Sequence, residues 1–282
     1  MCAKIRVLII LSLQAYALVI YMDILVKVLV CLLAGIGAGL GTGFAGMSAA
    51  AVIIPVLVGL LDIEPYTAVG VALASDVLAS AVSAITYKKS KNTDIKNGMY
   101  LFISVIVATV FGSIVGRYIP DTFLGGASII MALILGVKFL VKPIMVPKIA
   151  FASLKRSTFI TYSILCGTAV GFICGCVGAG GGLAMLFVLT SVLGYDLKKA
   201  VGTSVFIMTF SALVGAVSHF AVGAFPDPVL LFLCVMFTLI FAMFAAKIAN
   251  KAAPRVLNRL VGIILLVIGI GIGIIQIFKY VI

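Results

Sequence analysis

The chain carries nearly the same sequence pattern twice, 132 residues apart. Its glycines recur without a gap: Gly35, Gly39, Gly43 and Gly46 become Gly167, Gly171, Gly175 and Gly178. The run 68–70, Ala-Val-Gly, recurs at 200–202. The two copies lie in a chain that is 64% hydrophobic. A duplicated membrane protein with interrupted helices is typical of secondary transporters, whose site lies where the repeats meet.

The composition indicates a protein that is embedded in a membrane. Mean hydropathy is +1.37 and only 10% of the residues are charged, too few to cover the surface of a soluble fold. Continuous apolar stretches of about 20 residues, enough to cross the hydrocarbon core, follow one another with short polar breaks. The sequence therefore predicts an all-α, polytopic helical protein of the cell membrane, with several spans.

The net charge of +12 could suggest a nucleic-acid partner. The basic residues, however, occupy the gaps between apolar stretches, which is how membrane proteins fix their orientation. Membrane lipid is thus the expected anionic surface partner, and no nucleic acid is expected. The sequence leaves the formation of a homo-oligomer open.

Each repeat divides into five apolar segments, and the second segment of each is short. The predicted segments are 24–43, 47–61, 66–87, 98–117 and 121–141 in repeat 1 (24–141), and 157–176, 180–193, 198–221, 227–248 and 255–278 in repeat 2 (157–278). A basic linker, 142–156, joins the repeats and is expected on the cytoplasmic side. About 14 helical residues reach only about 21 Å, so the glycine turns before the short segments should lie at membrane depth.

The distribution of positive charge favours a topology in which the short second segment of each repeat crosses the membrane. In that case the loops 88–97, 142–156, 194–199 and 247–259, with 14 of the 20 Lys and Arg residues, all fall on one side. Five crossings per repeat is an odd number. The two repeats are therefore predicted to insert in opposite orientations, as inverted repeats.

Residues 1–22 precede the duplicated unit and allow three interpretations. Lys4 and Arg6 before an apolar stretch fit a signal peptide with a cleavage site after Ala17. The stretch could equally form an extra span, or lie upstream of a true start at Met22. We favour the extra span.

The glycine turns are the predicted substrate site. A turn before a short helix leaves the first N–H groups of that helix unpaired, and the helix dipole adds positive potential there. We expect a small anion to bind between Gly46 and Ser48 of the first turn and the glycines of the second, which are Gly178, Gly180, Gly181 and Gly182. Tight packing of helices is the alternative role for such glycines, and we assign the row Gly35, Gly39 and Gly43 to packing.

The third segment of each repeat supplies polar groups near these turns. Thr203 and Ser204 are further candidates for substrate binding. Asp76 is placed near the bilayer centre, where a charge costs at least about 2.5–3.5 kcal/mol, so it is the candidate for proton coupling. A protonated acid in a seam between helices is the alternative. Its counterpart in repeat 2 is Met208, so the halves differ here.

Cys174 and Cys176 form the other reactive pattern, and they raise the alternative of a sulfur-trafficking membrane protein. An anion channel is a further alternative. The chain has one histidine and no catalytic motif, so neither an enzyme, nor a metal site, nor a cofactor is expected.

With these residues in view, the chain resembles the TauE/SafE family of sulfite and organosulfonate exporters. The resemblance covers about 24–278 and is most specific at 178–182 and at 200–204, Ala-Val-Gly-Thr-Ser. Repeat 1 departs from the family pattern, with Gly46-Met-Ser-Ala49 in place of a glycine run and Val71-Ala72 in place of Thr-Ser. The resemblance implies the transport of sulfite or an organosulfonate across the cytoplasmic membrane.

Overall fold

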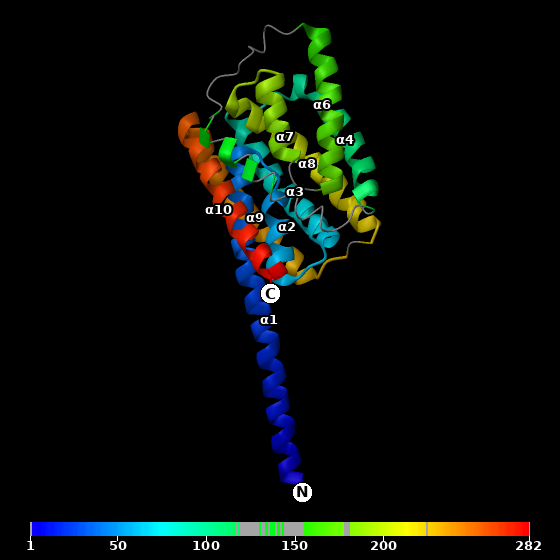
Figure 1. Ribbon diagram of the computed structural model, residues 1–282, viewed down its shortest axis with the longest axis vertical. Helices are drawn as coiled ribbons and strands as arrows, with labels where there is room; N and C mark the ends of the chain where they lie inside the picture. The colour runs from blue at the N-terminus through cyan, green and yellow to red at the C-terminus, as the bar shows by residue number, and fades with distance from the viewer. Residues whose placement is uncertain are drawn as a thin grey trace.

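The structure is a computed structural model, shown in Figure 1. It describes residues 2–116, 118, 130, 133–134, 136–138, 140–141, 143, 155–177, 181–223 and 225–281. All regular elements within these residues are helices. Most of the predicted segment 121–141 and of the linker 142–156 lies outside the described residues.

The helices follow the predicted segments closely. They are α1 (Cys2–Ala45), α2 (Ala50–Leu61), α3 (Pro65–Lys89), α4 (Ile95–Gly116), α6 (Arg156–Val177), α7 (Gly181–Phe187) with its π-helical continuation η2 (Val188–Val192), α8 (Leu197–Ala221), α9 (Pro228–Lys251) and α10 (Pro254–Val281). Six of them contain spans long and apolar enough to cross a membrane, which are Tyr21–Ala45, Pro65–Lys89, Ile95–Gly116, Arg156–Cys176, Leu197–Ala221 and Pro228–Lys251. The prediction of a polytopic helical membrane protein is confirmed.

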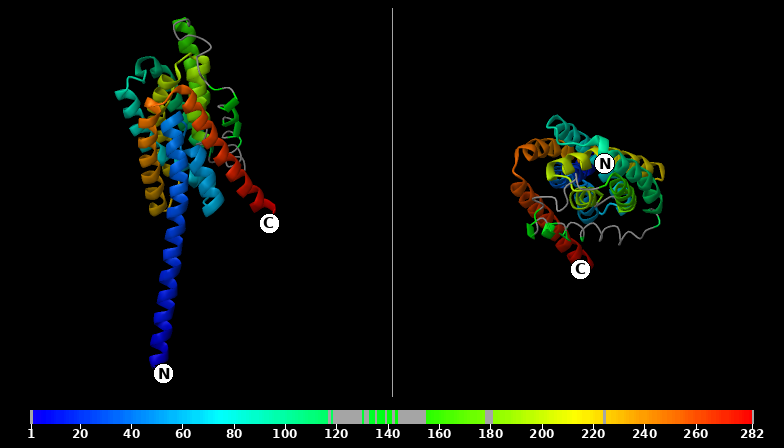
Figure 2. Two further views of the ribbon diagram at one scale, coloured as in Figure 1. Left: turned by 90° about the vertical axis from the view of Figure 1, so that its left-hand side faces the viewer. Right: turned by 90° about the horizontal axis from the view of Figure 1, so that it is seen from above.

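Residues 2–20 continue α1 without a break, and Figure 2 shows this end of the helix reaching well beyond the bundle. At 1.5 Å per residue, the 44 residues of α1 extend about 66 Å, twice the thickness of the hydrocarbon core. The role of residues 1–22 stays a prediction.

The two repeats share the bounds of their helices. The helices α3 and α8 are both 25 residues long, and their starts and ends are each 132 residues apart. The ends of α1 and α6, Ala45 and Val177, have the same offset. The 132-residue spacing in the sequence is thus also a spacing in the structure.

The turns after the short helices also correspond. Asp62 and Gly194 both have a left-handed backbone, with φ of 53° and 74°. In each repeat the next residue donates its N–H to a carbonyl oxygen six residues earlier, from Ile63 to Leu57 at 3.3 Å and from Tyr195 to Leu189 at 2.8 Å. The same backbone geometry therefore ends both short helices.

The helices α3 and α8 form the centre of the bundle, with 67% of their most apolar stretches buried. They run antiparallel. Gly215 of α8 packs against Leu73 near the middle of α3, and Gly202 packs against Tyr87 near its end. Helices that correspond in the two repeats therefore point in opposite directions, as an inverted pair requires. The inverted orientation in the membrane stays a prediction.

Two further pairs of long helices pack across the repeats. The helix α1 packs against α9, and α4 packs against α6. The glycine rows make these close contacts, because a Cβ atom on Gly39 would lie 2.6 Å from the carbonyl oxygen of Thr238, and one on Gly175 would overlap Thr109. The packing role assigned to Gly35, Gly39 and Gly43 agrees with this geometry.

Three of the basic loops meet at one end of the bundle. The side chain of Asn92 donates to the side-chain oxygen of Asn250 at 2.9 Å, and Lys198 donates to the backbone carbonyl of Asn250 at 2.9 Å. These contacts join the loops 88–97, 194–199 and 247–259. Their shared end agrees with the predicted clustering of positive charge, and their location in the cytoplasm stays a prediction.

Candidate functional site

The first glycine turn joins α1 to α2. Gly46 follows the last residue of α1 and has φ of +61°, a left-handed conformation that glycine adopts without strain. Its N–H donates to the carbonyl of Thr42 at 2.9 Å, and α2 begins at Ala50. The turn therefore reverses the chain inside the protein, as predicted, and presents the start of α2 to the neighbouring helix α3.

Asp76 lies against this start of α2. Its carboxylate accepts hydrogen bonds from the hydroxyls of Ser48 at 2.9 Å and Ser80 at 2.8 Å, and from the backbone N–H of Ala49. The side chain is 1% exposed. The place predicted for a substrate anion at the start of α2 thus holds a carboxyl group of the chain itself.

The start of α7 meets the first turn. Gly178 and Gly180 lie outside the described residues, so only Gly181 and Gly182 can be placed. A Cβ atom on Gly182 would lie 2.5 Å from both the carbonyl oxygen of Gly46 and the nitrogen of Ser48. Absence of a side chain at Gly182 is therefore what allows the start of α7 to touch the first turn.

The two polar residues of α8 divide between different surroundings. A Cβ atom on Gly46 would overlap the hydroxyl of Ser204, so Ser204 lies at the first turn. The hydroxyl of Thr203 instead accepts the N–H of Asp94, at 3.0 Å, in the loop before α4. The geometry does not bring Thr203 to the glycine turns.

Asp94 also holds that loop to the end of η2. Its carboxylate accepts from the backbone N–H of Asn97 at 3.1 Å and from the hydroxyl of Tyr195 at 3.5 Å. Burial is the main cause that raises the pKa of Tyr195 above its ordinary value, and Asp94 raises it further. Tyr195 therefore stays a neutral donor at physiological pH, and Thr203 belongs to this contact between loops.

Sulfur atoms line the side of α7. A Cβ atom on Gly181 would lie 2.8 Å from the Sγ of Cys174, and one on Gly182 would lie 2.6 Å from the Sδ of Met208. Cys174 also hydrogen-bonds to Ser211. Cys176 lies elsewhere, with its backbone against Gly112 and Gly116 of α4. The two cysteines of the 174–176 pattern thus face different neighbours.

Asp76 and Met208 occupy corresponding positions in their repeats and face corresponding helix starts. Asp76 faces the start of α2, and Met208 faces the start of α7. One helix start is therefore in contact with an acidic group and the other with a neutral thioether. The two helix starts correspond in their positions in the repeats, but the side chains that face them differ in whether they can carry a charge.

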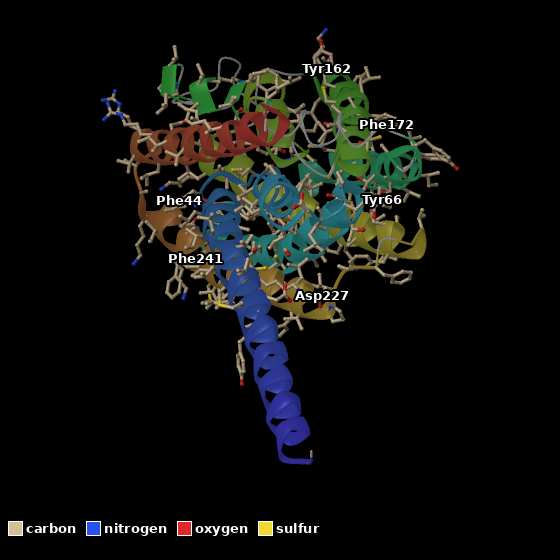
Figure 3. The ribbon with its side chains drawn as sticks, turned by 60° about the horizontal axis from the view of Figure 1, so that its bottom comes forward. Phe44, Tyr66, Tyr162, Phe172, Asp227 and Phe241 are labelled. Carbon is tan, nitrogen blue, oxygen red and sulfur yellow. The ribbon has the colours of Figure 1, made fainter. Side chains whose placement is uncertain are left out.

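His219, the one histidine of the sequence, is buried near the end of α8. Its ring lies 4.3 Å from that of Tyr66, which is labelled in Figure 3, and its Nε2 is 3.2 Å from the carbonyl oxygen of Gly175. The side chain is 0% exposed. Sequence reasoning missed this burial, because the histidine is close to the end of an apolar segment and is covered by packing against α3 and α6.

An apolar cavity of about 350 Å³ lies apart from these polar groups, between α1, α2 and α10. Its lining includes Leu33, Val52, Pro55 and Ile263, and none of its lining side chains is polar. The side chains of this cavity offer no hydrogen-bond donor to an anion. The glycine turns, where donors are present, are therefore the better candidate for an anion site.

The spans define a polytopic helical membrane protein, and its similarity to known proteins identifies it as a membrane transporter. The chain belongs to the TauE/SafE family, since the family model described as "Sulfite exporter TauE/SafE" matches residues 31–272. The resemblance inferred from the glycine turns is confirmed.

Three curated proteins are similar over most of their length. The chain is 26% identical to "Probable membrane transporter protein YdhB" of Bacillus subtilis over 217 residues, which are 76% of this chain and 87% of that protein. It is 30% identical to YunE of Bacillus subtilis over 63% of this chain and 72% of that protein. It is 27% identical to MJ0441 of Methanocaldococcus jannaschii over 72% and 77%. No solved structure matches the chain significantly.

Proposed function

We propose that this transporter carries a small anion of the sulfite or organosulfonate class, and that the anion binds where the glycine turns of the two repeats meet. The observation that carries the proposal is the Asp76 carboxylate at the start of α2. Ser48 and the N–H of Ala49 donate to it, so this buried place supplies hydrogen-bond donors that the oxygen atoms of an oxyanion could also use. The name of the family model gives the same charge for the substrate.

Asp76 and the substrate would compete for the same hydrogen-bond donors at the start of α2. An ionised carboxylate uses the donors of Ser48, Ser80 and Ala49. A second anion beside it would be repelled strongly, because the electrostatic interaction is large inside a protein. A proton on Asp76 removes the repulsion and leaves donors free for the substrate. The geometry therefore favours a proton and an anion that bind together.

The same coupling works in either direction across the membrane. If a proton raises the affinity for the anion, the anion raises the affinity for the proton by the same factor. The gradients of the two ions then decide whether the anion enters or leaves. Export driven by the membrane potential alone would need no coupled proton.

The test is counterflow of radiolabelled sulfite in proteoliposomes, with sulfate and taurine as competitors. We expect unlabelled sulfite inside the vesicles to accelerate the uptake of labelled sulfite, and a lower pH to increase it. Absence of accelerated exchange in folded protein would contradict sulfite as substrate. Conductance without counterflow would favour a channel.

A second candidate is the sulfur-trafficking function, which the position of Cys174 favours. Its thiol lies beside Gly181 and bonds to Ser211, so it borders the proposed site. Cys176 packs against α4 instead. If a sulfur relay operates, replacement of both cysteines by serine should abolish activity, whereas an anion carrier should retain it.

A further inference from the structure

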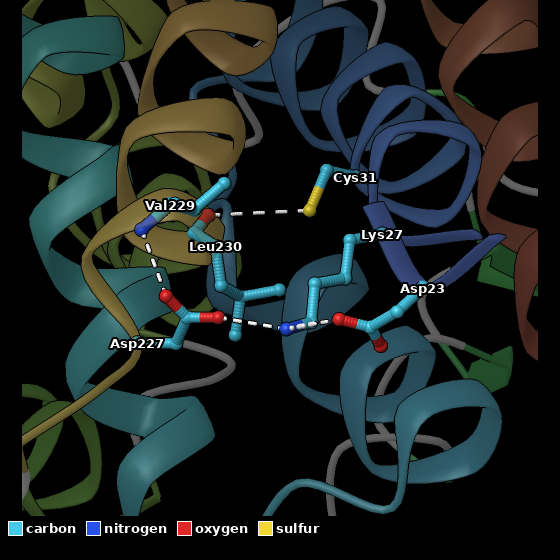
Figure 4. A network of polar contacts seen from close by, with 6 residues as sticks. All are labelled: Asp23, Lys27, Cys31, Asp227, Val229 and Leu230. Atoms are coloured by element: carbon cyan, nitrogen blue, oxygen red, sulfur yellow. Dashed lines mark hydrogen bonds and ion pairs between the residues drawn. The ribbon is translucent and has the colours of Figure 1, made fainter. Parts of the chain in front are cut away.

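Two buried cysteines from different repeats face one another where α1 packs against α9. The Sγ atoms of Cys31 and Cys234 are 3.3 Å apart, and both residues are 0% exposed. Both are free thiols, and the sulfur of Cys31 also approaches the carbonyl oxygen of Leu230 at 3.9 Å (Figure 4). The proposed transport site uses neither of them.

Contacts on both sides hold the two sulfur atoms at this distance. One turn before Cys31, the ammonium of Lys27 bridges the carboxylates of Asp23 and Asp227, at 2.9 Å each (Figure 4). One turn after it, Gly35 packs directly against Phe237 of α9. The two helices are therefore fixed relative to one another around the thiol pair.

A bond between the sulfurs needs only a small movement. An S–S bond is about 2.03–2.05 Å long, so the two sulfurs would need to come roughly 1.3 Å closer. Rotation of the two side chains about their Cα–Cβ bonds is the movement that would bring the sulfurs together.

The thiol pair lies close to a polar end of the bundle. The side chains of Asp23 and Asp227 are 59% and 36% exposed. Cys31 follows Lys27 by four residues, a depth of about 6 Å along the helix. Hydrogen peroxide is small and uncharged, which suits it to reach buried thiols that lie about one helical turn from this polar end.

We propose that Cys31 and Cys234 form a redox-active dithiol, which hydrogen peroxide converts into a disulfide between α1 and α9. One sulfur attacks the O–O bond of the peroxide, which yields a sulfenic acid and one water. The second sulfur then attacks the sulfenic sulfur and releases a second water. Two thiols thereby lose two electrons and two protons, which reduce one peroxide to two waters. A thiol reductant reverses the reaction.

The disulfide would join the first repeat to the second by a covalent bond. It encloses about 200 residues of chain, so it restricts the unfolded state strongly. We expect oxidation to raise the thermal unfolding temperature of the protein. Because α1 and α9 already pack as a pair, the bond should leave the fold unchanged.

The experiment uses the full-length protein in lipid nanodiscs, treated with hydrogen peroxide and then with N-ethylmaleimide. After proteolysis, mass spectrometry without reductant should find the peptides of Cys31 and Cys234 joined, and dithiothreitol should separate them. Oxidation should raise the unfolding temperature of the unaltered protein and of the control Cys166→Ser, but not of Cys31→Ser or Cys234→Ser.

The mass measurement on the unaltered chain decides the proposal by itself, whether or not the serine variants fold. Recovery of both residues as separate maleimide adducts, from oxidised protein that keeps its helical circular dichroism, would overturn it. A disulfide that joins other cysteines instead, such as Cys174 and Cys176, would overturn it equally.

Discussion

The hydroxyl of Ser48 donates a 2.9 Å hydrogen bond to the carboxylate of Asp76, which joins the start of α2 to the middle of α3. The bond connects a short helix that begins at a glycine turn to the most buried acidic side chain among the described residues. A change in the charge of Asp76 therefore acts directly on the helix start where we expect the substrate.

Asp76→Asn should remove the pH dependence of sulfite exchange. The amide keeps the size of the carboxyl group and accepts hydrogen bonds, but it carries no proton to exchange. The measurement is the rate of counterflow between about pH 5.5 and 8, a range in which a coupled acid must titrate. Asp62→Asn is the matched control, because asparagine adopts the left-handed backbone of that position readily. An unchanged pH profile in Asp76→Asn would return Asp76 to a structural role.

Gly182→Ala should abolish exchange or reduce it severely. The added Cβ would lie 2.5 Å from backbone atoms of Gly46 and Ser48, and overpacking of this kind costs about 1–3 kcal/mol. Gly271→Ala is the control, since nothing lies within 4 Å of a Cβ there. Exchange rates and the unfolding temperature should be measured for both. Normal exchange in Gly182→Ala would contradict close contact of the turns.

Tyr87→Phe should destabilise the protein by about 0.5–1.5 kcal/mol, the usual value of one hydrogen bond. The hydroxyl of Tyr87 donates to the carbonyl of Gly43 at 3.1 Å, and its counterpart His219 contacts the carbonyl of Gly175 at 3.2 Å. Tyr162→Phe, on the exposed face of α6, should have no effect. The comparison is made by denaturant or thermal unfolding, and equal stability of all three proteins would refute the structural role of the bond.

The ion pair between Lys27 and Asp227 should stabilise the folded protein at neutral pH, and this stabilisation should be lost in acid. Hydrogen bonding from Lys27 is the main cause that lowers the pKa of Asp227 from its ordinary value, and the N–H of Val229 adds to it. Because the folded pKa is depressed, the stabilisation is present above the unfolded value of about 3.9 and disappears as the pH falls through the folded value. The unfolding temperature of Lys27→Met should therefore be lower than that of the unaltered protein at pH 7. The difference should vanish in strong acid, and a difference that grows there would contradict the assignment.

Cysteines placed at Lys91 and Lys251 should react with an impermeant maleimide from the same side of the membrane. Their loops are joined by the hydrogen bond between Asn92 and Asn250. A cysteine at Glu64, before α3, should react from the opposite side. Opposite reactivity of the positions 91 and 251 would overturn the predicted topology.

The bounds of the helices could be predicted from the sequence because hydrophobic length and glycine turns are local signals. The segment 198–221 is observed as 197–221, and 66–87 as 65–89. The repeat spacing also located the two helix starts. These features depend on residues that are neighbours in the chain.

Partners that come from distant segments could not be predicted in the same way. Thr203 and Ser204 are adjacent, so they point about 100° apart on a helix, and only Ser204 reaches the turn. The contact of Ser48 with Asp76 and the burial of His219 depend on how α2, α3 and α8 pack. No pattern within one segment carries that information.

The exchange of partners between the repeats limits how the molecule can be divided. The first helical segment of each repeat packs against the fourth segment of the other, α1 on α9 and α6 on α4. A chain cut between the repeats would leave each half with two long helices that lack their companions. Such a half could complete its packing only with a second half-length chain, which makes this monomer the covalent equivalent of an intertwined dimer.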